Sequence, residues 1–143
     1  MPARSKARKR ALDVLYESDL RGVDARVTLH ERMAQADPPV PAYAIALVEG
    51  VLAQQERIDA LLEEYAEGWS LSRMPAVDRN VLRIGAYELL FCSDIPDGVA
   101  VSEAVTLAAA LSTEESSGFV NGLLGRLLQL KPGLVPALEN PTD

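Results

Sequence analysis

The densest group of chemically active side chains in this sequence is a basic cluster within its first ten residues. All five cationic members come before any acidic residue: Arg4, Lys6, Arg8, Lys9 and Arg10. Lysine and arginine attract phosphate groups through an electrostatic interaction that weakens with salt and does not depend on sequence. The cluster therefore predicts the binding of a polyanion.

The cluster stands out because the rest of the chain is acidic. The first ten residues contribute +5, whereas the remainder, with nine of the 14 basic and all 21 acidic residues, has a balance of −12. A net charge of −7 disfavours nonspecific binding of nucleic acid, and one basic patch directs a polyanion to a single face. The alternative is a solvated, disordered charge run at the N-terminus.

An amphipathic helix over about residues 4–20 should position the cluster. Apolar residues follow it at helical spacing, and Gly22 fits the end of the helix. Because Arg8, Lys9 and Arg10 are consecutive, they fan over roughly 200° of the helix and cannot all avoid solvent. The merging of the cluster into a helix argues against the disordered charge run.

The remaining pattern predicts an all-α fold, because no segment alternates apolar and polar residues and Pro or Gly breaks separate the helical stretches. A chain of 143 residues with 48% apolar content can form one domain with a sizeable core. We expect this domain at residues 1–135, with helices at about 4–67 and 75–130. Lys131, Pro132 and Gly133 should end the last helix near Leu130, leaving 136–143 as a weakly ordered tail.

Three glycines share one face of the last predicted helix, where each costs ~1 kcal/mol relative to alanine. They are Gly118, Gly122 and Gly125. Close approach of another helix or of a partner's backbone would compensate for this cost. Phe119 beside them is either a core residue or a stacking surface for an unpaired base. We expect Trp69, the only tryptophan, to anchor the core.

Arg79 and Arg83 lie one turn apart on the polar side of a predicted helix. Such a pair can bind phosphate, or it can form ion pairs with acids such as Asp78 or Glu88. The second arrangement is the commoner one.

Residues for catalysis are sparse. His30 is the sole histidine and has no evident nucleophile near it, and neither a glycine-rich phosphate loop nor metal-ligand spacing occurs. Cys92, the only cysteine, cannot form an intrachain disulfide or a multi-cysteine zinc site. We therefore expect no enzyme activity, no metal and no cofactor.

No targeting or membrane signal is evident. The basic start lacks the apolar run of a signal peptide, and no apolar stretch approaches the ~20 residues that a membrane-spanning helix needs. We expect a cytoplasmic protein without a membrane partner.

Five separated segments resemble the NusB family of bacterial transcription factors. In the family's order, they are Arg8 to Tyr16, Trp69 to Met74, Asp78 to Leu89, Ser102 to Val105 and Phe119 to Leu124. The resemblance covers residues 4 to about 130. Its most specific part is the Trp-to-Arg stretch joined to Leu-Arg-x-x-x-Tyr-Glu-Leu.

The resemblance implies a fold of about seven helices in two small subdomains and a role in transcription antitermination, notably on ribosomal RNA operons. Members of the family pair with the ribosomal protein NusE. The pair binds boxA RNA in the nascent transcript as part of an RNA polymerase antitermination complex. The implied mechanism is assembly rather than catalysis.

The family's RNA-binding positions fall on residues already described. Its arginine-rich start matches Arg8, Lys9 and Arg10, with Arg4 and Lys6 as further contacts, and its Phe-Val-Asn-Gly motif makes Phe119 the candidate RNA-facing aromatic. Arg79 and Arg83 complete the RNA-binding candidates.

The candidate contacts with NusE are Glu115, at an acidic position that precedes the Phe-Val-Asn-Gly motif, and Tyr16. Gly118 stands where relatives often have a basic residue, and lysines are few elsewhere. We therefore expect partner contacts to supply more of the affinity for RNA.

Two other functions fit the same residues. The NusB-like RNA-binding domain of some ribosomal RNA methyltransferases is one, but no methyl-donor domain follows the last helix here, which favours a free-standing factor. The other is a protein-binding helical module that forms a homodimer through the glycine face.

Overall fold

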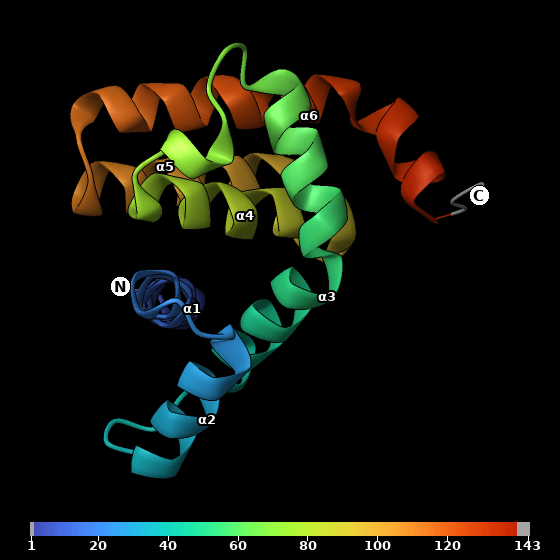
Figure 1. The fold of residues 1–143 in the computed structure, drawn as a ribbon. Helices are drawn as coiled ribbons and strands as arrows, with labels where there is room; N and C mark the ends of the chain where they lie inside the picture. Colours follow the sequence, from blue (N-terminus) through green and yellow to red (C-terminus); the bar gives the residue numbers. More distant parts are fainter. Residues whose placement is uncertain (1, 140–143) are drawn as a thin grey trace.

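The computed structural model describes residues 2–139, and within them the chain is entirely helical (Figure 1). Its elements are α1 (Ala3–Arg21), α2 (Ala25–Gln35), α3 (Ala42–Tyr65), the 3₁₀ helix η1 (Leu71–Arg73), α4 (Ala76–Phe91), α5 (Asp97–Leu111) and α6 (Glu114–Glu139). The predicted all-α fold is confirmed. The expected seven helices correspond, in residues 2–139, to six α-helices and one 3₁₀ turn.

Helix α1 matches its predicted position. It ends at Gly22, whose φ of 67° lies in the left-handed region that glycine adopts without steric cost. Its apolar stripe, which includes Ala11, Leu12 and Leu15, is buried against α3 and α4. The basic start of the helix is thereby fixed to the folded body and is not a detached tail.

The helices are arranged around α1 and α3 (Figure 1). Helix α2 lies on one side of α1, whereas α4, α5 and α6 pack together on its other side, and the long helix α3 runs past both groups. One continuous apolar core contains residues of all six α-helices, such as Leu12 of α1, Leu47 of α3 and Leu124 of α6.

The last helix is longer than predicted. We expected α6 to end near Leu130, but it continues to Glu139 and bends in its final part (Figure 1). Residues 136–139 of the expected tail are therefore helical. The rest of that tail, residues 140–143, lies outside the described residues.

Packing explains why α6 passes through two prolines. Pro132 and Pro136 each remove a backbone donor, but both are exposed, and proline is a common cause of a helix kink. The Lys131 ammonium lies 2.5 Å from the Asp97 carboxylate on α5. Three apolar residues beyond the first proline pack against the core: Leu134, Val135 and Leu138. These tertiary contacts outweigh the local signal to stop.

The close helix approach predicted at the α6 glycines is absent from the described chain. A Cβ atom built on any of the three would meet nothing within 4 Å. The close approach occurs instead at Gly85 of α4, where a Cβ would lie 2.6 Å from a methyl carbon of Leu124 and 3.0 Å from that of Ala104. Gly85 thus permits α5 and α6 to pack on α4, and the α6 glycines form an open face.

Candidate nucleic-acid interface

Three of the five basic residues at the chain's start face solvent. Arg4 is half exposed, with its guanidinium 4.6 Å from the centre of the Tyr43 ring and 3.6 Å from the Asp94 carboxylate. Lys6 is exposed, and Lys9 lies 3.3 Å from the equally exposed Asp13. Exposed ion pairs of this kind are weak, so these cations can exchange their partners for phosphates.

Arg8 points the other way, into the protein. It is 3% exposed, and its Nε donates hydrogen bonds of 2.8 and 3.0 Å to the two carboxylate oxygens of Glu88, itself 1% exposed. The Tyr43 hydroxyl also donates to Glu88, and Glu103 lies 3.4 Å from the Arg8 guanidinium. Arg8 is therefore not available to a polyanion in this arrangement, although it belongs to the basic run.

The pKa values of this buried group follow from its contacts. Burial alone would lower the pKa of Arg8, but the hydrogen bond and the charge of Glu88 outweigh it and raise that pKa above its usual value. Burial, together with the Glu88 carboxylate, raises the pKa of the Tyr43 phenol well above its ordinary value. Arg8 is thus held charged and Tyr43 neutral.

Arg10 occupies an intermediate position. Its side chain is half-buried and donates a 3.2 Å hydrogen bond to the Pro38 carbonyl between α2 and α3. The expected basic cluster therefore divides by direction: Arg4, Lys6 and Lys9 face outward, Arg10 supports a loop, and Arg8 lies inside.

Arg79 and Arg83 pair with acids, as the commoner interpretation of their spacing predicts. The Arg79 Nε lies 3.0 Å from Asp19 of α1. Arg83 donates two hydrogen bonds of 2.9 and 3.0 Å to the Asp59 carboxylate of α3. Their partners are Asp19 and Asp59, and not Asp78 or Glu88. Both arginines therefore join helices in this structure.

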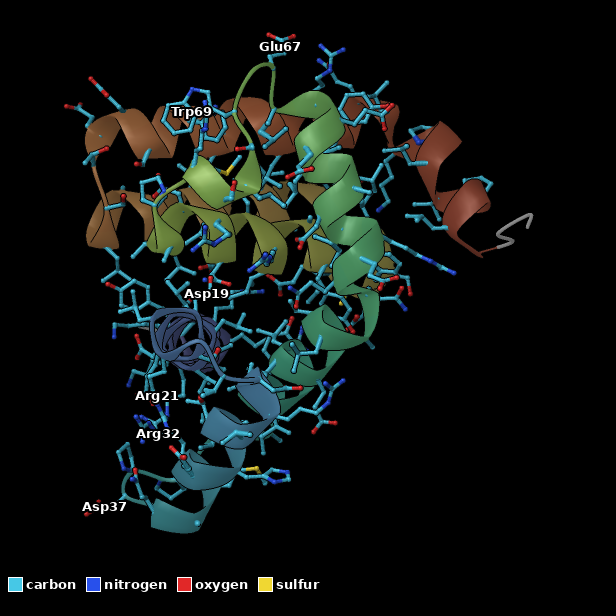
Figure 2. The ribbon with its side chains drawn as sticks, viewed as in Figure 1. Asp19, Arg21, Arg32, Asp37, Glu67 and Trp69 are labelled. Carbon is cyan, nitrogen blue, oxygen red and sulfur yellow. The ribbon has the colours of Figure 1, made fainter. Side chains whose placement is uncertain are left out.

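Phe119 is half-buried and lies beside Trp69. Their ring centroids are 5.7 Å apart with an angle of 38° between the planes. The prediction that Trp69 anchors the core is wrong, because 51% of its surface is exposed. Figure 2 shows Trp69 beside α6, the helix that carries Phe119. Trp69 follows a left-handed turn at Glu67 (φ 42°) and Gly68 (φ 86°), which carries it to the surface between α3 and η1.

The basic and aromatic groups lie toward opposite ends of α4. Arg8 fixes the start of α1 to Glu88 near the end of α4. At the other end of α4, Asp78 accepts a 2.7 Å hydrogen bond from Ser116, which lies near the start of α6. Asp78 and Glu88 lie ten residues apart on α4, which is a rise of about 15 Å along the helix. A ligand that touches both groups must therefore be extended.

The two partner candidates lie on different helices. Glu115 is exposed in the first turn of α6, where a carboxylate interacts favourably with the helix N-terminus. Tyr16 is half-buried on α1. Glu115 and Tyr16 do not contact each other in the structure.

Metal-binding and membrane-spanning features are both absent from the described residues. Within residues 2–139, no three His, Cys, Asp or Glu side chains are placed to hold a metal ion. None of the helices in this part of the chain is long and apolar enough to cross a membrane.

Together, the fold and these surfaces define a small all-helical protein with an outward-facing basic helix start and a separate, partly exposed aromatic pair. A sequence model of the NusB family matches residues 5–129. The chain belongs to the NusB family, as its motifs indicate.

Individual relatives agree with this assignment. The chain is 58% identical over 134 residues to the transcription antitermination protein NusB of a Nocardioides species, covering 94% of this chain and 99% of that protein. It is 62% identical over 129 residues to the same protein of Saccharopolyspora erythraea, covering 89% and 87%.

Solved structures match as well. Thermotoga maritima NusB superposes with a TM-score of 0.76 at 36% identity, covering 90% of this chain and 92% of that one. A chain from a crystal structure of the antitermination factors NusB and NusE in complex with double-stranded RNA has a TM-score of 0.77 at 30% identity, covering 88% and 96%.

Proposed function

We propose that this protein is a transcription antitermination factor that binds boxA RNA of nascent ribosomal RNA transcripts together with NusE, within an RNA polymerase antitermination complex. The observation that carries the proposal is the outward-facing group of Arg4, Lys6 and Lys9 on an otherwise acidic protein. The solved relative that contains NusB, NusE and RNA supports it.

The binding surface divides two tasks. The cations of α1 attract phosphates and supply affinity, whereas the choice of RNA sequence requires unpaired bases, stacking and hydrogen bonds to base edges. Phe119 is the expected stacking residue. Its distance from the basic start, toward the other end of α4, fits an extended single strand.

Within this surface, Arg8 acts as a positioning residue. By holding α1 against α4 from inside, its contact with Glu88 fixes the direction in which Lys6 and Lys9 project. Three other arginines have supporting contacts. Arg10 holds the loop between α2 and α3 at Pro38. Arg79 joins α4 to α1 at Asp19, and Arg83 joins α4 to α3 at Asp59.

Glu115 and Tyr16 are the proposed contacts with NusE. The mechanism is the assembly of a complex, so the protein acts as a binding factor rather than as an enzyme, and it works in the cytoplasm beside RNA polymerase. The grouping of its helices into two subdomains stays a prediction.

A binding assay with labelled boxA-like and scrambled RNA, with and without NusE, tests the proposal. We expect boxA-like RNA to bind more tightly than scrambled RNA, and NusE to increase that difference. Equal binding of both RNAs in the presence of NusE would contradict it.

The open glycine face of α6 favours a second function, self-association as a homodimer. Gel filtration with RNA titration separates the two. A dimer whose formation is indifferent to RNA would support the self-associating module.

A further inference from the structure

An open groove of about 660 Å³ lies between the end of α3, the loop at Trp69 and the glycine face of α6. Trp69, Phe119, Asn121, Gly122 and Arg126 are among the residues that line it. None of the contacts that hold α1 in place involves this groove. The groove is therefore a surface separate from the basic start of the chain.

The aromatic wall of the groove is open to solvent. Trp69 contacts Phe119 in a tilted arrangement, yet half of its surface remains exposed. Tryptophan and phenylalanine faces stack on nucleobases of any sequence, and such stacking is one of the main sources of affinity in single-strand binding.

The opposite wall permits a flat ligand to approach the helix backbone. Gly122 and Gly125 line the groove and have no side chain to obstruct it, since the space where a Cβ would lie is empty. Asn121 is exposed beside them, and its amide can both donate to and accept from a base edge.

Cations flank the aromatic pair. Arg126 is 52% exposed and has only a distant contact, of 3.8 Å, with the highly exposed Glu67, while its guanidinium lies 5.4 Å from the centre of the Tyr65 ring. Arg73 is exposed on the other side of Trp69. Glu67 is the acidic residue among those that line the groove.

We propose that this groove binds one unpaired RNA base, stacked on Trp69 and Phe119 over the glycine face, with Arg126 and Arg73 directed to the flanking phosphates. This inference rests on the proposed function and adds residues to it. A protein helix is the less suitable occupant, because Asn121, Arg126 and Glu67 interrupt the continuous apolar stripe that helix docking requires.

Trp69 provides its own reporter, because it is the only tryptophan in the chain. Labelled boxA-like RNA is titrated against the protein while anisotropy reports binding and tryptophan fluorescence reports the groove. We expect fluorescence quenching on binding, and an RNA series with one abasic nucleotide at successive positions should contain one member that binds without quenching.

Variants separate stacking from folding. Trp69→Leu should weaken RNA binding about five- to a hundredfold without changing its salt dependence, because no phosphate contact is lost. Trp69→Phe should retain most of the affinity. The control is Val99→Ala, a change at another exposed apolar residue, which should bind RNA as the parent protein does.

The outcomes distinguish the two proposals. RNA binding without quenching, together with unchanged affinity of Trp69→Leu, would overturn the groove assignment and leave the proposed function standing. A Trp69→Leu variant that loses NusE but keeps RNA would also overturn it, by identifying a protein interface. Failure of RNA to bind the parent protein, alone or with NusE, would refute both.

Discussion

The guanidinium of Arg8 and the carboxylate of Glu88 meet at 2.8 and 3.0 Å inside the protein, although 80 positions separate them in the chain. This contact ties α1 to α4 at the place where the basic cluster begins. Because both residues are almost fully buried, each depends on the other for compensation of its charge. The relationship makes Arg8 a structural residue within a run of surface cations.

Replacement of Arg8 or Glu88 alone should therefore lower the stability of the protein strongly. Replacement of both should lower it by less than the two single changes together. Arg8→Met and Glu88→Met should each lower the free energy of unfolding by about 3–5 kcal/mol, because an unpaired buried charge remains. The double variant should be more stable than the sum of the single losses predicts. Urea denaturation at pH 7 measures all four proteins, and strictly additive losses would show that the two charges are not coupled.

The raised pKa of Tyr43 predicts a loss of stability at high pH. The folded protein holds the phenol proton more tightly than the unfolded chain does. The stability that protonated Tyr43 contributes is therefore complete below the unfolded pKa of about 10 and declines as the pH rises above it. Tyr43→Phe lacks the titrating group. The stability difference between parent and variant should therefore be constant from pH 7 to 9 and shift against the parent above pH 10. A difference that stays constant to pH 11 would contradict the raised pKa.

Two helical glycines should respond in opposite ways to alanine. Gly85→Ala places a methyl group within 2.6 Å of Leu124 and should lower the free energy of unfolding by about 1–3 kcal/mol. Gly118→Ala meets open space and should raise it by up to about 1 kcal/mol, because alanine favours the helix. Thermal denaturation of the two variants checks this, and a stabilised Gly85→Ala protein would argue against the close packing of α4 with α6.

Charge reversal at the start of α6 tests the partner surface. Glu115→Lys should weaken association with NusE more than it weakens RNA binding by this protein alone, because the proposed role of Glu115 is with the partner. Glu114→Lys, one position away on the same exposed turn, is the matched control. Pull-down of NusE by each variant gives the comparison, and normal pairing by Glu115→Lys would remove this residue from the proposed interface.

The sequence predicts the helices well where local signals and tertiary packing agree. The apolar stripe of α1 and its stop at Gly22 are visible in the residues themselves. At the end of α6, the two prolines give a correct local signal that contacts from distant segments overrule, such as the one between Lys131 and Asp97. Such contacts cannot be derived from periodicity.

The sequence predicts which residues form the basic group, but not the direction in which each side chain points. Consecutive basic residues such as Arg8, Lys9 and Arg10 must fan around a helix. The pattern does not say which one turns inward, because the answer depends on Glu88, far away in the chain. Trp69 differs in the opposite sense, because it was expected in the core and lies at the surface. Its size favours the core, whereas the left-handed turn at Glu67 and Gly68 places it at the surface.

The role of α1 as the phosphate-binding surface is tested most directly by the salt dependence of RNA binding. The variant to use removes two outward-facing cations of α1, Lys6→Ala with Lys9→Ala. The control is Arg26→Ala with Arg57→Ala, which removes the same charge from exposed positions on α2 and α3. We predict weaker binding for the α1 variant alone, with the helicity of both proteins unchanged. Its salt slope should fall by about 1.4, at ~0.7 per phosphate contact with single-stranded RNA. An α1 variant whose slope equals that of the control would contradict the assignment of this helix as the phosphate-binding surface.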